Sequence, residues 1–476
     1  MSKVHKQRMA LGVGLLNLSA WIRRQPWLKA VYRHFPWAFR HKMSEALAAR
    51  AHEQIRFRRT PNWRRRTRQE DPAPTNATLG AMYREAIGVN IFAYARGQFG
   101  LAEGARLYAR ALLAEGYPVA IHNIAIDMPH GMDDSSLDAH IGDETPYGVN
   151  LIFVNPDYLD EAIAIIGRQR LGDRYLIACW FWELEVFPEA WLPALSLVDE
   201  VMVATCFIEK AVRRVTDKPV WHVPLPVGEA IDSGLMRADF GLDEDAFIFL
   251  SSFDFNSFMT RKNPIAVMKA FQMAFADGRP DVRLLIKASN GHRHPTKLQE
   301  LLAAASTDRR IIIRDEVIDR SNVQALQRCA DAYVSLHRAE GFGLGLAECM
   351  RLGKPVIATA WSGNMDFMTA ENSCLVDYEL VPVGEGEYLH HANQRWAEPD
   401  VAHAAEQMRR VAEDSEFAAT IGTQASLDIR NWLSPQETAH RIIKRLGVVL
   451  SNSDARGKSG IPLPIGGRAG YESNGP

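Results

Sequence analysis

The sequence predicts an α/β protein built from two doubly wound halves that face one cleft. Three observations support this prediction. Apolar strand patterns alternate with amphipathic helical patterns along the chain, which favours parallel sheets covered by helices. The alternation restarts after a proline-marked extended stretch at 222–230. The 476 residues, of which 47% are hydrophobic, are sufficient for two such cores.

The first half begins with an apolar run at 87–95, which we expect to form a buried strand. A glycine-bearing loop follows it, and then an amphipathic helical pattern that ends at Gly116. The next strand is expected directly after that glycine. The remaining strands of this half are predicted at 149–156, 174–183 and 200–206.

The second half repeats the alternation. Its first strand is predicted at "AFIFLSSFDF", and an amphipathic helix closed by Gly278 follows. Further strands are expected at "DVRLLIKAS", "RRIIIRDEV", "DAYVSLHR" and "KPVIATAW". The last two of these strands lie on either side of a glycine-rich stretch, where we look for the chemistry of the protein.

Composition and periodicity divide the chain into five parts. We expect a basic arm and linker at 1–79, a Rossmann-like domain at 80–225, a second Rossmann-like domain at 226–430, a terminal helix at 431–450 that crosses back to the first domain, and a disordered tail at 451–476. The five cysteines are scattered and form no CxxC pair. They indicate reduced thiols and a cytoplasmic protein.

The basic arm is the one strongly charged part of the chain. Residues 1–69 hold 17 Lys/Arg against two acidic residues, a net charge of +15, whereas the whole chain has a net charge of −2. Aromatic and basic side chains interleave at 8–42, which suits an anionic membrane surface. We therefore expect a peripheral protein on the inner face of the plasma membrane. An arm that is docked on the body or solvated is the alternative. Nucleic acid is not expected as a partner, although its phosphates would also be attracted to a basic arm.

The most informative stretch runs from His337 to Asn364, "HRAEGFGLGLAECMRLGKPVIATAWSGN". Glu340 precedes a glycine-rich loop, and Glu348 lies in the helix expected after it. Glycines let a backbone approach a ligand closely, and a helix N-terminus offers free N–H groups, a combination that binds phosphate. Glu348 can accept hydrogen bonds from a ribose diol, and Glu340 can reach a group attached beyond the phosphate. Taken alone, the two glutamates are equally consistent with a solvated pair.

Residues 335–377 as a whole resemble the group 1 (family four) retaining glycosyltransferases of the GT-B fold. In that family, two glutamates at this spacing precede a "GKPVIAT" strand and a glycine-bearing turn. The resemblance implies two Rossmann-like domains facing a central cleft and a bacterial polysaccharide-type enzyme. It also implies a nucleotide-diphosphate sugar as co-substrate, transfer with retention at the anomeric carbon, and no metal or other cofactor.

The resemblance also implies roles for particular residues. Glu348 would hold the ribose and Glu340 the donor sugar, while Lys262, with Arg261 as a second cation, would clamp the diphosphate. The Gly-Arg pair that the family places after the preceding strand is replaced here by Phe253 and Asp254. Glu340, Lys262 and Arg261 are thus the expected catalytic residues, and the expected donor contacts besides Glu348 are Phe342, Gly343, Leu344, Ser362, Gly363, Asn364 and Gly100.

The first half is expected to supply the acceptor contacts. The loop at 96–106, which includes Glu103, would cover the donor phosphates or the acceptor, although a plain structural turn explains it as well. Similar family sequences carry a "WELE-x-FP" segment, in which Trp182 would stack on a sugar and Glu183 would bind an acceptor hydroxyl. Core packing is the alternative for these aromatic residues. The acidic cluster at 243–245 is interpreted as a solvated turn, so no metal site is predicted.

The expected function is a hexosyltransferase of exopolysaccharide or lipopolysaccharide biosynthesis. Family habit favours GDP-mannose as the donor and a glycan or a polyprenyl-diphosphate-linked oligosaccharide as the acceptor. The alternative is a non-catalytic nucleotide-sugar-binding or scaffold protein of the same fold. A nicotinamide-dependent oxidoreductase would need G-x-G-x-x-G after the first strand, and "GQFGLAEG" does not fit that pattern.

Overall fold

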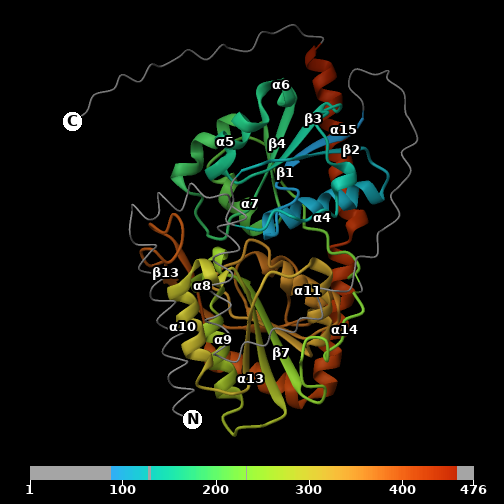
Figure 1. Ribbon diagram of the computed structural model, residues 1–476. Helices are drawn as coiled ribbons and strands as arrows, with labels where there is room; N and C mark the ends of the chain where they lie inside the picture. Colours follow the sequence, from blue (N-terminus) through green and yellow to red (C-terminus); the bar gives the residue numbers. More distant parts are fainter. Residues whose placement is uncertain (1–86, 127–129, 232, 458–476) are drawn as a thin grey trace, which may run out of the picture.

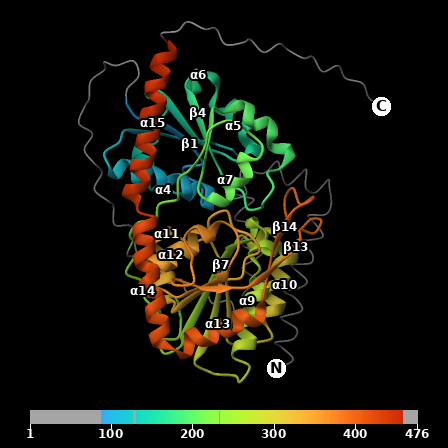
Figure 2. The same cartoon turned by 180° about the vertical axis from the view of Figure 1, so that it is seen from behind.

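The computed structural model describes residues 87–126, 130–231 and 233–457. Two six-stranded parallel sheets lie one above the other, each covered by helices (Figures 1 and 2). The predicted α/β class with two doubly wound halves is confirmed. The basic arm, including residues 8–42 for which we expected membrane contact, lies outside the described residues. Within the described ranges, no helix combines the length and the apolar character that crossing a bilayer requires.

The first sheet has the strand order β2-β1-β3-β4-β5-β6. All of its pairings are parallel. Its strands are β1 (Val89–Ala93), β2 (Val119–Asn123), β3 (Val149–Phe153), β4 (Tyr175–Trp180), β5 (Glu200–Val203) and β6 (Val220–His222). Strand β1 is buried along its whole length because both faces of the sheet are covered. Its Ile91 packs in one hydrophobic cluster with α4 and α15, and its Phe92 packs in another with α5 and α7.

The second sheet has the strand order β12-β11-β10-β7-β8-β9, again entirely parallel. Its strands are β7 (Phe247–Asp254), β8 (Val282–Ser289), β9 (Ile311–Asp315), β10 (Ala332–Ser335), β11 (Val356–Thr359) and β12 (Cys374–Val376). Counted from β7, this order is the 3-2-1-4-5-6 arrangement of dinucleotide-binding sheets. Because the order reverses between β7 and β10, the loops that follow these two strands diverge and leave a crevice between them.

The helices connect the strands of both sheets. Those of the first part of the chain are α4 (Gly100–Ala114), α5 (Pro156–Ile166), α6 (Arg168–Leu171) and α7 (Cys206–Arg213). Those of the second part are α8 (Met259–Lys262), α9 (Pro264–Ala274), α10 (Pro295–Ala305), α11 (Arg320–Cys329), α12 (Leu344–Arg351), α13 (Val401–Glu413) and α14 (Ser415–Trp432). Short 3₁₀ turns complete the connections: η1 (Asp138–His140), η2 (Glu189–Leu197), η3 (Phe255–Ser257), η4 (Gly291–Arg293) and η5 (Gly363–Asp366).

A separate two-stranded antiparallel hairpin reaches from the second domain toward the first. It consists of β13 (Tyr378–Pro382) and β14 (Arg395–Pro399). Gln394, just before β14, donates a 2.7 Å hydrogen bond to the Val186 carbonyl of the first domain and accepts one of 3.2 Å from the Val186 N–H. The hairpin therefore holds the two domains together at one end of the cleft.

Helix α15 (Pro435–Gly457) starts at the level where the two domains meet and runs along α4 of the first domain (Figures 1 and 2). The sequence pattern suggested one continuous terminal helix, but the helix breaks between Trp432 and Pro435. Proline lacks the N–H that a helix interior needs and is tolerated in the first turn of a new helix. The disordered tail expected from 451 is wrong at its start, since α15 continues to Gly457.

The Arg445–Glu200 ion pair fastens α15 to the first sheet. Glu200 is completely buried, and its carboxylate is paired with the Arg445 guanidinium and also accepts from the Tyr175 hydroxyl at 3.1 Å. We expect Arg445→Ala to lower the free energy of unfolding by about 3 kcal/mol, because it leaves a buried charge without its partner. Chemical denaturation measures this loss.

A matched control lies one turn earlier on the same helix. Arg441 pairs with Glu437, and both side chains are about half exposed. We expect Arg441→Ala to change the free energy of unfolding by no more than about 0.5 kcal/mol. Equal losses in the two variants would contradict a specific role for the buried pair.

Candidate active site

The topology of the second sheet brings Lys262 and Glu340 together. Strand β7 ends at Asp254 and its loop leads into α8, whose last residue is Lys262. Strand β10 ends at Ser335 and its loop carries Glu340 toward α12. Since β7 and β10 are the strands between which the order reverses, both loops border the crevice where α/β sheets of this kind bind their ligands.

Glu340 is held by two cations. Its carboxylate is paired with the Lys262 ammonium on one oxygen, and Arg261 Nη1 lies 3.3 Å from the other oxygen. Burial by itself raises the pKa of Glu340, but Lys262 and then Arg261 outweigh it and lower the pKa to about 2. The carboxylate is therefore ionised at every pH at which the protein is expected to work.

The two cations differ in character. Burial, only partly offset by Glu340, lowers the pKa of Lys262, so its ammonium gains from any further negative group that comes near. Burial also opposes the charge of Arg261, but Tyr388, Glu183 and Glu340 raise its pKa. Arg261 donates a 2.8 Å hydrogen bond to the Ala339 carbonyl as well. It is a fixed positive charge that orders the Glu340 loop.

Two glycine-bearing loops meet beside this cluster. The Glu340 N–H donates to Ser362 Oγ at 2.8 Å, and the Gly363 N–H donates to the Glu340 carbonyl at 2.9 Å. A Cβ at position 363 would lie only 2.2 Å from the Gly341 carbonyl oxygen, so only glycine permits this approach. The predicted pair of turns, at 340–344 and at 362–364, therefore forms one continuous surface.

Gly343 and Asn364 fix the shape of that surface. Gly343 has φ of +94° and is the residue before the first turn of α12, which begins at Leu344. The Asn364 side chain is fully buried; its oxygen lies 3.0 Å from His337 Nε2, and its amide donates to the Thr359 carbonyl at 3.1 Å. The free N–H groups at the start of α12 consequently border the crevice, where a phosphate would be stabilised.

Glu348 lies in α12 and is largely buried. Its carboxylate accepts a 2.9 Å hydrogen bond from Gln327 Nε2 and is also paired with Arg320. Arg320 Nε lies 3.4 Å from Glu103 Oε1 on α4 of the first domain. One arginine therefore joins Glu348 to Glu103 across the cleft, and a ribose that binds Glu348 must share the carboxylate with Arg320.

The geometry accords with what comparison with known proteins shows. Residues 246–414 match the family model described as group 1 glycosyl transferases. Over these residues the chain is similar in sequence to the group 1 glycosyltransferases. The matched range contains Lys262, Glu340 and Glu348 as well as the turn at 362–364. No curated protein matches the chain in sequence.

Solved structures of glycosyltransferases share the whole fold. HepE from Anabaena, in complex with UDP and glucose, has a TM-score of 0.54 and 14% identity, covering 76% of this chain and 100% of its own. Sucrose-phosphate synthase from Thermosynechococcus elongatus has a TM-score of 0.55 and 16% identity, covering 78% and 100%. A glycosyltransferase from Rickettsia africae has a TM-score of 0.55 and 13% identity, again covering 78% and 100%. At these identities the similarity establishes the GT-B fold and nothing further.

The structure brings most of the predicted donor residues together, but some of them offer only their backbone to the crevice. Phe342 is only 4% exposed, and its ring packs 5.1 Å from that of Phe367. Its side chain belongs to the core, so only its backbone groups could contact a donor. Gly100 is exposed at the start of α4, and nothing lies within 4 Å of where its Cβ would be. A glycine is therefore not sterically required at that position.

Trp182 does not fit its predicted role as a stacking platform for the acceptor. It is 1% exposed, its indole N–H donates to the Val186 carbonyl at 2.9 Å, and Trp191 packs against it at 4.8 Å. A sugar ring could reach Trp182 only by displacing these neighbours. The alternative interpretation of this aromatic segment, as core packing, is the correct one for Trp182.

The two predicted acceptor acids are engaged in ion pairs. Glu103 accepts from Arg106 at 2.9 and 2.6 Å, and Arg106 in turn donates to the Ala95 and Gly97 carbonyls. Glu103 therefore shapes the loop at 96–106 in this structure. Glu183 accepts from the Tyr388 hydroxyl at 2.6 Å and lies 3.8 Å from Arg261 Nη2, which places it beside the cation cluster.

Two site residues escaped the sequence analysis. Tyr388 comes from the irregular tip of the hairpin, where no periodicity marks a side chain that reaches the other domain. Arg320 had a detectable signal. It is seven positions from Gln327 on α11, so the two share a helix face, and both contact Glu348.

Proposed function

We propose that this glycosyltransferase moves a hexose, with retention, from a nucleotide-diphosphate sugar to a hydroxyl of a glycan or lipid-linked glycan in the synthesis of a bacterial surface polysaccharide. The observation that carries the proposal is the Arg261–Lys262–Glu340 cluster beside the glycine-lined start of α12. It gathers two cations, free backbone N–H groups and one carboxylate at the crevice of a doubly wound sheet.

The two cations and the N-terminus of α12 stabilise the leaving diphosphate. Negative charge develops on the diphosphate as the bond to the sugar breaks, and fixed donors aimed at that charge lower the barrier. Lys262 and Arg261, with the N–H groups at Leu344 and Gly345, would take this role where other transferases use a metal ion. Because burial disfavours the charged form of Lys262, its ammonium gains more from the diphosphate than an exposed lysine would.

Glu340 positions Lys262 and binds the donor sugar. Without donor, its ionised carboxylate keeps Lys262 in place. With donor bound, the same oxygens can accept hydrogen bonds from sugar hydroxyls while Arg261 retains the loop. The acceptor hydroxyl then attacks on the face that the diphosphate leaves, which preserves the anomeric configuration. Retention itself rests on the family resemblance.

Two observations favour different donors. Family habit favours GDP-mannose, whereas the similar HepE structures hold UDP with glucose or UDP-glucose. At such low sequence identity, the donor bound by those proteins does not identify the donor of this one. A panel that includes both nucleotide sugars is therefore the direct test.

The experiment has two stages. Thermal unfolding with GDP-mannose, UDP-glucose and UDP-N-acetylglucosamine should show one donor that raises Tm, since a ligand present at 100 times its Kd adds about 2.7 kcal/mol to stability. That donor is then incubated with the glycosyltransferase and a lipid-linked glycan, and NMR reads the anomeric configuration of the product. An inverted anomer would contradict retention. Binding without any transfer or donor hydrolysis would instead support a non-catalytic nucleotide-sugar-binding protein.

A further inference from the structure

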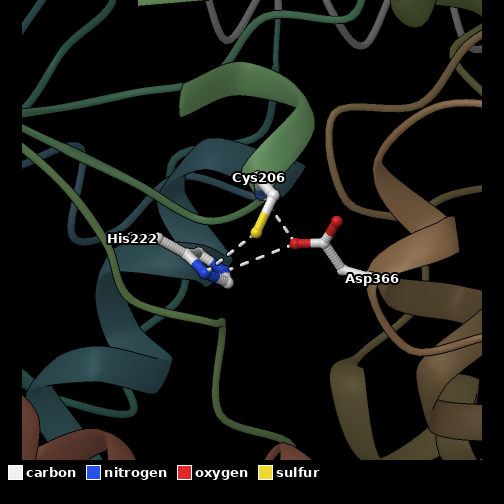
Figure 3. A group of neighbouring side chains, drawn as sticks. All are labelled: Cys206, His222 and Asp366. Atoms are coloured by element: carbon white, nitrogen blue, oxygen red, sulfur yellow. Dashed lines mark hydrogen bonds and ion pairs between the residues drawn. The ribbon is translucent and has the colours of Figure 1, made fainter. Parts of the chain in front are cut away.

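A cysteine, a histidine and an aspartate converge where the two domains touch (Figure 3). Cys206 is the first residue of α7, His222 ends β6, and Asp366 ends the turn η5 of the second domain. Cys206 Sγ lies 3.4 Å from His222 Nδ1, and Asp366 Oδ2 lies 3.4 Å from His222 Nε2. One ligand atom from each residue can be chosen so that all three lie within 4.8 Å of one another.

This group joins residues that are far apart in the chain. Asp366 closely follows the donor turn at 362–364, and its carboxylate accepts a 2.7 Å hydrogen bond from the Cys206 N–H. The preceding Thr205 donates to the Gly341 carbonyl at 3.0 Å. The convergence is therefore part of the contact that sets the first domain against the two donor loops.

We propose that Cys206, His222 and Asp366 bind a zinc ion that bridges the two domains of this protein. Sulfur, imidazole nitrogen and carboxylate oxygen are the ligand types that zinc prefers, and three protein ligands plus one water complete a tetrahedral site. Zinc bonds of about 2.0–2.3 Å place tetrahedral ligands roughly 3.3–3.6 Å apart. The 3.4 Å separation of Sγ and Nδ1 already fits.

Only a small movement is needed to complete the site. Only one imidazole nitrogen can bind the ion. The separations between the three ligand atoms are at most 4.8 Å, so any that exceeds the tetrahedral spacing must shorten by no more than roughly 1.5 Å. The His222 and Asp366 side chains are 21% and 18% exposed, which leaves a path for the ion and for a water ligand. On binding, zinc displaces the thiol proton, which passes to solvent.

The order of thiol, imidazole and carboxylate is also the one found in enzymes that use a cysteine as nucleophile. Burial, followed by Asp366, raises the pKa of the Cys206 thiol to about 11. An activated nucleophile needs a lowered thiol pKa, so this environment does not favour covalent catalysis. A thiophilic cation, by contrast, supplies the positive charge that stabilises the thiolate.

The experiment uses the full chain, reduced and stripped of metal by a chelator. Zinc is added and the excess removed by gel filtration, and the bound metal is measured by mass spectrometry. We expect one zinc per chain for the parent protein and an affinity at least about tenfold lower in Cys206→Ser and in His222→Ala. Cobalt in place of zinc should give a thiolate-to-metal absorption band that Cys206→Ser abolishes.

Matched controls separate this site from incidental binding. Cys329→Ser removes another half-buried thiol, and His440→Ala removes an exposed imidazole that pairs with Glu115; both should retain one zinc. Substoichiometric zinc in the parent protein, or equal binding in Cys206→Ser, would overturn the proposal.

Bridging of the domains has its own measurement. Zinc should slow amide hydrogen exchange at 204–208 and at 362–367 together, because one ion would hold both segments. Protection confined to the first segment would overturn the bridging role. None of these measurements needs donor or transfer, so the result is independent of the reaction proposed above.

Discussion

Replacing Lys262 with methionine is expected to lower kcat for sugar transfer by about 10²–10³-fold. Methionine keeps much of the length of the lysine stem but carries no charge, so the leaving diphosphate loses one of its two buried cations. Arg261 remains in place through its 2.8 Å hydrogen bond to the Ala339 carbonyl. Once the panel of nucleotide sugars has identified the donor, steady-state kinetics at saturating donor measure the loss of kcat.

Two further variants isolate the effect of the charge. Lys262→Arg keeps a cation near Glu340 and should recover part of the rate. Lys297→Met removes a lysine that pairs with Glu300 on an exposed face of α10, and it should leave kcat unchanged. A kcat for Lys262→Met within about threefold of the parent, with donor bound, would exclude Lys262 from the stabilisation of the leaving group.

The sequence was sufficient to predict the fold class because the signals for strands, loops and helices are local. The strand at β10, the glycines of the following loop and the helix at α12 are neighbours in the chain, and their order alone predicts a strand–loop–helix phosphate site. The strand order of the second sheet was not readable in the same way. It depends on the face of the sheet against which each crossover helix packs, and no local pattern in β7 or β10 indicates that these strands are neighbours.

The same distinction explains which of the predicted site residues the structure brings together and which it does not. Lys262 and Glu340, which the family resemblance singled out, do lie together, because each follows one of the two strands between which the sheet order reverses. Trp182 was misassigned because an aromatic segment has the same composition whether it packs in a core or lines a sugar site. Its burial is decided by Trp191 and by a hairpin tip about two hundred residues later, which no local pattern reveals.

The link between Glu348, Arg320 and Glu103 shows what long-range contacts add to the prediction. The sequence suggested separate roles for Glu348 at the donor ribose and for Glu103 at the acceptor. In the structure one arginine contacts both carboxylates, so the helices α12 and α4 of the two domains are coupled. A donor that binds Glu348 would therefore also act on the contact between α12 and α4.

Glu348→Gln is expected to raise the Kd of the donor about 10–100-fold while the fold is retained. Glutamine has the same shape but cannot offer a charged acceptor, and a hydrogen bond to a charged group contributes about 1.5–3 kcal/mol. The Gln327 amide can still donate to the new side-chain oxygen, and Arg320 keeps its contact with Glu103. The rise in Tm that the donor produces in the parent protein should therefore be much smaller in this variant.

The control for this variant is an acid outside the crevice. Asp245 lies exposed in the turn before β7, where its N–H donates to Asp243 Oδ1 at 3.4 Å, so Asp245→Asn should leave the donor-induced rise in Tm intact. Because both substitutions remove one negative charge, a general electrostatic effect on an anionic donor would change both variants alike. Loss of the shift in Glu348→Gln alone would assign the effect to a direct contact with the donor, whereas equal changes in the two variants would remove Glu348 from the donor site.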